Sequence, residues 1–290
     1  MRYNNNSNID SNGNLSFNWL EFKQWVKNKY AKTYSPTILC YVRKYKHLIY
    51  GNLKELDFLT DSTKATVVKA LIILSKFLGI HRQFRQRLAD YGVKIHRQDS
   101  FTSFLRILNT NSNGNGILEW LNEVQPILSD NENTFLKFCL YSGLRKQEAI
   151  TSFNKIIELH KSGNLNYYDS NLNCLLHFKY PKEFIRRTKN CFISFVTKDL
   201  IDQICNCQPV SYSAIRKRLE RKHIKMRINE LRDYFGTYLL QHGILEPEIN
   251  LLQGRIPPSI FIKHYWSPKL SELRDRIFKA LKDLESTKNI

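Results

Sequence analysis

The stretch INELRDYFGTYLLQHGILEPEINLLQGRIPPSIFIKHYW, residues 228–266, holds the features around which the chain is organised. Apolar residues recur at helical spacing in its first part, which predicts a helix from Asn229 to about Gln241. A second helix is expected over about 247–252. The residues predicted to face the core of the first helix are Leu231, Phe235, Tyr238 and Leu239.

Three polar side chains stand at marked places in this stretch. Arg232 lies early in the first helix, Arg255 follows a Gln-Gly turn, and Tyr265 lies in a short aromatic run. Guanidinium groups bind phosphate oxygens through paired hydrogen bonds, and a phenol can act as a nucleophile. The stretch therefore predicts a site that handles a phosphodiester.

The composition of the whole chain points to a polyanionic partner. Its 290 residues include 45 Lys and Arg against 26 Asp and Glu, a formal net charge of +19. Such a surplus fits nucleic acid or an anionic membrane surface. No apolar run is long enough to span a bilayer, and the first residues lack the apolar core of a secretory signal. We therefore expect DNA or RNA as the partner, and no membrane.

The first half of the chain predicts a small helical domain. An Asn- and Ser-rich segment, residues 1–14, is expected to be a flexible tail, and residues 15–108 to form four or five short helices. Ser35 is the expected cap of the second helix, followed by Pro36. The cations predicted to face DNA are Lys27, Lys29, Lys32, Arg43, Lys44, Lys46, Arg82, Arg85 and Arg87.

Residues 109–116, NTNSNGNG, contain turn formers only and are expected to link this domain to a second one over 117–290.

In the second domain a helix breaks at Gly143, and Arg145 opens the next helix. An arginine there can bind an anion beside free backbone N–H groups. It can equally pair with Glu148 on the next turn. The pattern alone leaves both interpretations open.

Two segments rich in β-branched and aromatic residues, 173–180 and 191–197, are predicted to be strands of a hairpin. The basic connection between them is suited to placing a lysine in a DNA groove. A further helix, about 211–222, is basic on more than one face, as expected of a helix along a DNA groove. A last amphipathic helix, about 268–284, is expected to pack on its own domain or on a neighbouring subunit.

Four short motifs in order resemble those of the tyrosine recombinases, the phage-type integrases. They are YSGLRKQEA at 141–149, NELRDYF at 229–235, LQGR at 252–255 and KHYW at 263–266. The chain is most similar to the integrases of spindle-shaped archaeal viruses and related plasmids. The resemblance implies a mainly α fold with a small antiparallel sheet: a helical core-binding domain followed by a catalytic domain.

The resemblance also implies a catalytic set. Its members are Arg145, Lys189, Arg232, Arg255 and Tyr265, with Tyr265 as the nucleophile and Lys189 as general acid. Lys182 and Lys179 are alternatives for the acid. The chain departs from the common pattern at two positions: Asn229 replaces a His or Lys, and Arg255 replaces a His.

The activity implied is site-specific recombination of a viral or plasmid element through a 3′-phosphotyrosine. The resemblance implies a homotetramer on double-stranded DNA attachment sites in the cytoplasm of the host cell. Because the phosphotyrosine conserves the bond energy, we expect neither a metal ion nor another cofactor. Three alternatives stay open: a Xer-like dimer resolvase, a type IB topoisomerase-like enzyme, and a DNA-binding protein that no longer cuts.

Overall fold

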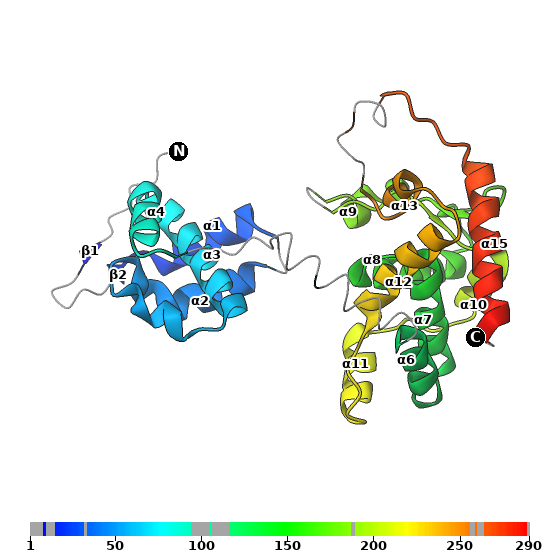
Figure 1. Ribbon diagram of the computed structural model, residues 1–290, viewed down its shortest axis with the longest axis horizontal. Coiled ribbons are helices and arrows are strands. Elements are labelled where there is room, and N and C mark those ends of the chain that lie inside the picture. Colours follow the sequence, from blue (N-terminus) through cyan, green and yellow to red (C-terminus); the bar gives the residue numbers. More distant parts are fainter. Residues whose placement is uncertain are drawn as a thin grey trace. The chain divides into compact units, whose positions relative to one another are not determined.

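The computed structural model describes residues 8–9, 15–31, 34–93, 105, 116–186, 189–255, 259 and 264–288. The chain divides into two compact units, residues 1–108 and 109–290 (Figure 1). Their buried side chains form two separate clusters, one in each unit. Each unit therefore has a hydrophobic core of its own.

Unit 1 is a bundle of short helices around α3. Phe22, Val42 and Leu71 are among the side chains that fill its core. Its α-helices are α1 (Trp19–Lys29), α2 (Ser35–Tyr45), α3 (Asp61–Phe77) and α4 (His81–Asp90), and its 3-10 helices are η1 (Lys46–Ile49) and η2 (Leu53–Phe58). The expected fifth helix falls outside the described residues except for Leu105.

The two ends of the predicted helical domain differ from expectation where the structure describes them. Within the segment expected to be a flexible tail, β1 (Asn8–Ile9) pairs antiparallel with β2 (Leu15–Ser16). Apolar Ile9 and Leu15 are direct partners there, a pairing that composition alone does not indicate. Most of the expected linker lies outside the described residues, and Gly116 already belongs to the next helix.

Ser35 does not cap α2 as predicted. The N-cap is Tyr34, and Ser35 lies inside the helix with its side chain buried. The Ser35 hydroxyl donates to the carbonyl of Ala31 at 3.1 Å, just beyond the end of α1. A buried hydroxyl needs a partner, and the end of the preceding helix supplies one. The serine therefore joins α1 to α2.

Arg87, predicted to face DNA, instead binds carbonyl groups within unit 1. Its guanidinium donates to the carbonyls of Tyr50, at 3.2 Å, and Gly51, at 2.8 Å, and also to that of Ile49. Carbonyls at the end of a helix lack intrahelical partners, and the arginine satisfies those that follow η1. By contrast, the predicted surface cation Arg43 remains exposed and lies over the Trp19 ring.

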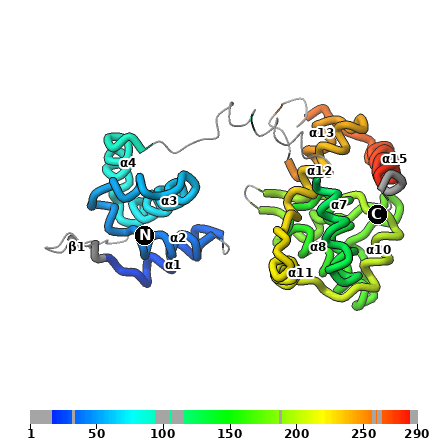
Figure 2. The backbone as a smooth tube through the Cα atoms, turned by 60° about the horizontal axis from the view of Figure 1, so that its bottom comes forward, coloured from blue at the N-terminus to red at the C-terminus, as the bar shows by residue number. Residues whose placement is uncertain are grey.

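Unit 2 is built around α7, which packs against α8, α10 and α12 (Figure 2). Its helices are α6 (Gly116–Val124), η3 (Gln125–Ile127), α7 (Asp130–Ser142), α8 (Lys146–Lys161), η4 (His177–Lys179), α9 (Pro181–Phe184), α10 (Lys198–Cys205), α11 (Tyr212–Glu220), α12 (Ile228–Gln241), α13 (Glu246–Leu252) and α15 (Leu270–Lys288). The predicted helices at 229–241 and 247–252 are confirmed as α12 and α13.

The sheet of unit 2 is antiparallel, in the order β3 (Tyr168–Asp169), β4 (Cys174–Leu175), β5 (Ser194–Phe195). The fold class of a mainly helical chain with a small antiparallel sheet is thereby confirmed. The predicted strands at 173–180 and 191–197 are, however, too long, since only two residues of each pair as strands. Beyond Leu175 the chain forms η4 and then α9, and α9 begins at Pro181, which lacks an N–H and favours the first turn of a helix.

The last helix, α15, packs on its own unit. Its residues Leu273 and Ile277 are almost fully buried in the core of unit 2. The Tyr238 hydroxyl of α12 donates to the carbonyl of Ala280 at 3.0 Å. Within the described residues, none of the helices has both the length and the apolar character needed to cross a bilayer.

Candidate functional site

The turn between α7 and α8 carries the first predicted arginine. Gly143 ends α7 with a left-handed φ of +60°, and its N–H donates to the Cys139 carbonyl. A Cβ atom on Gly143 would lie 2.2 Å from the ring of Phe235 in α12. Only glycine lets the turn pack this closely against α12. The chain then reaches Arg145, the N-cap residue of α8.

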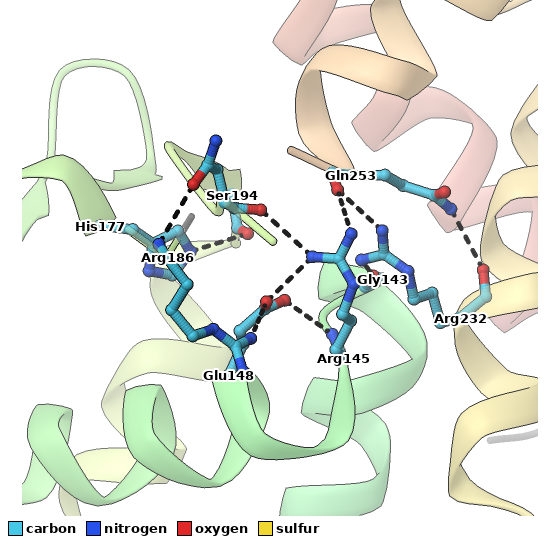
Figure 3. Close-up of polar contacts among 9 residues, drawn as sticks. Gly143, Arg145, Glu148, His177, Arg186, Ser194, Arg232 and Gln253 are labelled. Atoms are coloured by element: carbon cyan, nitrogen blue, oxygen red, sulfur yellow. Dashed lines mark hydrogen bonds and ion pairs between the residues drawn. The ribbon is translucent and has the colours of Figure 1, made fainter. Parts of the chain in front are cut away.

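Arg145 contacts three separate parts of unit 2 (Figure 3). Its guanidinium donates to the Glu148 carboxylate at 2.9 Å, to the Asn190 carbonyl at 3.1 Å and to the Gln253 carbonyl at 3.3 Å. Its backbone N–H also donates to Glu148, at 3.1 Å. The pairing with Glu148 that the sequence left open is therefore present. The side chain is still partly exposed, so the pairing does not exclude anion binding.

Arg232 reaches the same place from within α12. It is only 7% exposed, and it donates to the carbonyls of Gly143 and Gln253, each at 2.7 Å. The Gln253 carbonyl oxygen thus accepts hydrogen bonds from both Arg145 and Arg232. The structure brings these two predicted site residues together (Figure 3).

The turn after α13 closes onto the two arginines. Gly254 adopts a left-handed φ of +67°, and a Cβ atom there would lie 1.7 Å from the Asn190 carbonyl oxygen. The backbone of this turn therefore packs directly on residues 190–191. Arg255 follows, with its N–H bonded to the Asn250 carbonyl at 2.7 Å and its side chain exposed.

A tight loop carries Lys189 beside Arg145. Ile185 and Asn190 form an antiparallel bridge, and the N–H of Arg186 donates to the Asn190 side chain at 3.1 Å. Lys189 is exposed and immediately precedes Asn190, whose carbonyl accepts from Arg145. The lysine therefore lies at the edge of the arginine pair.

The two alternative lysines lie elsewhere on the connection. The Lys179 ammonium donates to the Asn166 carbonyl at 2.8 Å. Lys182 is exposed on α9. Neither residue adjoins a described contact of Arg145 or Arg232.

Positive charge dominates the site. Burial, the Arg145 cation and the Arg255 cation lower the pKa of Arg232 to about 10, while Glu148 acts in the opposite direction. Arg232 remains charged at neutral pH, since its pKa stays well above 7. Glu148 also pairs with Arg186, at 2.7 Å. Two arginines, Arg145 and Arg186, thus share one carboxylate, and the Arg145 cation also acts on Arg232, so an added anion would relieve the repulsion between these cations.

Tyr265 is not buried among the arginines. Its side chain is 74% exposed, and its ring lies edge-on to that of His264. Residues 256–258 and 260–263 lie outside the described part of the chain. That Tyr265 acts at the arginine pair therefore stays a prediction. Asn229, the departure from the common pattern, is exposed on the first turn of α12.

Sequence reasoning missed two contributors to the site. Glu148 was considered only as a partner of Arg145, although its place three residues after an N-cap is typical of a carboxylate that binds the helix start. The Gln253 carbonyl has no signal in the sequence, because it is a backbone atom placed by the turn.

Residues 110–283 match the archaeal phage integrase family, which covers more than half of the 290 residues. None of the curated proteins matches the chain. All the predicted site residues lie within the matched region. The resemblance found in the four motifs is thus confirmed at the level of the family. The chain belongs to the archaeal phage integrase family, and this membership implies DNA binding and site-specific recombination.

Proposed function

We propose that this chain is a site-specific recombinase that cuts and rejoins DNA through a 3′-phosphotyrosine on Tyr265. It integrates or excises a viral or plasmid element, acting as a homotetramer on double-stranded attachment sites in the host cytoplasm. The observation that carries the proposal is the meeting of Arg145 and Arg232, from α8 and α12, at the Gln253 carbonyl oxygen.

The paired guanidinium groups suit the two non-bridging oxygens of one phosphate. The described carbonyl bonds of Arg232 use two of its five N–H groups, so it can hold a phosphate without releasing its anchors. Arg145 remains partly exposed on the same side. As charge grows on the phosphate oxygens in the transition state, these fixed cations stabilise it more than they stabilise the substrate. Arg255 adds a third cation.

The reaction then balances as follows. The Tyr265 oxygen forms a bond to phosphorus, the bond from phosphorus to the 5′ oxygen breaks, and the phenolic proton passes to solvent. The 5′ oxygen takes a proton from the Lys189 ammonium, which acts as general acid. Rejoining reverses each step. The position of Lys189 beside the arginine pair supports this choice over Lys179, whose ammonium is bound to Asn166.

The alternatives make different demands on the same site. A Xer-like resolvase would use the same chemistry, and the match to archaeal phage integrases favours an integrase over it. A DNA-binding protein that no longer cuts would bind attachment-site DNA without bonding to it. A covalent adduct separates that last case from a recombinase.

The test uses a nicked suicide substrate carrying the attachment site, on which a cleaved strand cannot be rejoined. The full chain should form a covalent protein–DNA adduct, seen as a shifted band under denaturing conditions. Tyr265→Phe should form none. Tyr50→Phe, which removes another exposed phenolic hydroxyl, should react like the wild type.

A second variant, Arg232→Lys, tests the role of the paired guanidinium groups. The lysine keeps the charge but loses the planar fork, so adduct formation should slow by about 100-fold or more while DNA binding persists. A wild-type protein that binds attachment-site DNA tightly but never forms an adduct would leave only the non-cutting alternative.

A further inference from the structure

The loop that carries Lys189 is closed at its base by two contacts. Its described ends are joined by the Ile185–Asn190 bridge and by the bond from the Arg186 N–H to the Asn190 side chain. Lys189 itself is exposed. An exposed lysine on a short loop samples many positions, whereas a general acid must stay within hydrogen-bond reach of one oxygen.

Arg186 supplies a tether from this loop to the arginine pair. Its guanidinium donates to the Glu148 carboxylate at 2.7 Å, and the same Oε1 atom accepts from Arg145 at 2.9 Å (Figure 3). The Glu148 side chain is 1% exposed, whereas that of Arg186 is 41% exposed. The buried carboxylate is thus a fixed point, since α8 holds it, and Arg186 is the part that brings the loop to it.

Two further contacts place the other end of the loop. The Asn190 carbonyl accepts from Arg145 at 3.1 Å, and the Gly254 backbone packs against the same carbonyl. On either side of Lys189, Arg186 thus ties the loop to Glu148 and Asn190 ties it to Arg145, and Glu148 itself pairs with Arg145. Replacing the Arg186 side chain leaves the Ile185–Asn190 bridge and the Asn190 contacts in place but removes the tie to Glu148.

We propose that Arg186 is a positioning residue for Lys189: by binding Glu148 it holds the loop against Arg145, so that the ammonium reaches the 5′ leaving oxygen. This inference rests on the proposed function. It differs from a role in phosphate binding, because Arg186 acts on protonation of the leaving group and not on the charge of the phosphate.

The test compares two suicide substrates of the same sequence. One has the natural 5′ bridging oxygen, and the other has sulfur at that position. A thiolate leaves readily without a proton, so the sulfur substrate does not need the general acid. Single-turnover adduct formation is measured for the full-length wild type, Arg186→Gln, Arg186→Lys and Lys189→Ala. Lys161→Gln, which removes an exposed cation at the last residue of α8, is the matched control.

Arg186→Gln should slow the reaction of the oxygen substrate by about tenfold to 100-fold and leave the sulfur substrate within about twofold of wild type. Lys189→Ala should show the same pattern more strongly. Arg186→Lys should recover part of the rate, since lysine can still pair with Glu148. Lys161→Gln should react like the wild type with both substrates.

Equal slowing of both substrates by Arg186→Gln, or no slowing of either, would overturn the inference. Equal slowing would assign Arg186 to phosphate binding or to the placement of Arg145. The unfolding midpoint of each variant is measured alongside, so that a loss of folding is recognised as such. If the wild type forms no adduct with either substrate, the proposed function itself fails, and that result is distinct from a failure of the role given to Arg186.

Discussion

At the scale of single residues, the site contains two buried charged side chains, Arg232 and Glu148, and no described hydrogen bond joins one to the other. Arg232 is almost fully buried, yet its described hydrogen bonds go to backbone carbonyls and not to a carboxylate. Glu148, the one buried carboxylate among these contacts, is shared by Arg145 and Arg186. A buried charge without a full counter-charge lowers the stability of the fold. Such charges are typical of sites that bind an ion of opposite sign.

Gly254→Ala should be strongly destabilising. The new methyl group would meet the Asn190 carbonyl oxygen at 1.7 Å, and the backbone there cannot move cheaply. Gly163 is the matched control, since it has a similar φ of +72° with nothing within 4 Å. Gly163→Ala should cost about 1 kcal/mol from backbone strain alone, and Gly254→Ala about 3 kcal/mol or more. Urea unfolding measures both, and equal losses would contradict the close packing.

A buried histidine predicts how stability varies with pH. Burial lowers the pKa of His177 to about 3 from its ordinary value of 6.5, and its ring bonds to Tyr167 and to Ser194, the latter at 2.9 Å. The unfolded chain takes up a proton first as the pH falls. The contribution of His177 to the free energy of unfolding is therefore complete above pH 6.5 and is lost progressively as the pH falls towards 3.

Lowering the pH from 7 to 5 should thus reduce the free energy of unfolding by about 2 kcal/mol through this one group. His177→Gln should flatten that dependence. His160→Gln, a change at an exposed histidine, should not. Chemical denaturation at several pH values measures each slope, and a wild-type slope unaffected by His177→Gln would contradict the assignment.

At the scale of elements, the site is assembled mostly from turns and helix ends. Arg145 begins α8, Gln253 follows α13, and Lys189 lies on a loop, whereas Arg232 alone comes from within a helix. Such positions place backbone donors and acceptors beside the side chains. The element that follows Tyr265, helix α15, is anchored by its apolar stripe and by the ion pair between Arg276 and Glu248 of α13.

Ile277→Ala should loosen α15 from unit 2. The side chain is 1% exposed, and a truncation of this kind costs about 2–5 kcal/mol. Lys279→Ala, on the exposed face of the same helix, should cost less than about 0.5 kcal/mol. Urea unfolding, with proteolysis of the C-terminal segment as a second readout, measures the difference. Equal stability of the two variants would mean that α15 does not contribute to the core.

At the scale of the whole molecule, the chain has two hydrophobic cores and a large net positive charge. Because the buried clusters of the two units share no residue, each unit can fold on its own core. The net charge of +19 is spread over a chain that the family match implies to bind DNA. Unit 1 contributes exposed cations such as Lys27 and Arg43.

The affinity for attachment-site DNA should fall steeply as salt rises. Each phosphate neutralised adds about −0.9 to the slope of log K against log salt. A fragment beginning at residue 109 should keep its fold and show a shallower slope, because it lacks the phosphate contacts of unit 1. Salt titrations of full chain and fragment measure this. An unchanged slope would show that unit 1 does not touch DNA.

The helices of this protein could be predicted closely because their apolar residues recur at helical spacing. The stripe of α15 and the core face of α12 are examples, and both are buried apart from Tyr238 and Leu270, which are partly buried. The strands could not, since β3, β4 and β5 each have two residues and depend on their partners. The short α9 was missed because its four residues, Pro181–Phe184, are too few to show a helical period, and the segment reads as a basic connection.

The sequence by itself determined the fold class, the family, and the residue types of the site, because hydrophobic periodicity and motif spacing are local properties of the chain. Only the tertiary structure decided that Arg145 and Arg232 meet at the Gln253 carbonyl, and that Arg186 reaches Glu148. Those contacts join residues far apart in sequence, and one partner is a backbone atom that any residue would carry. These contacts form when α12, the turn after α13 and the loop at Asn190 pack together, and no local sequence pattern predicts that packing.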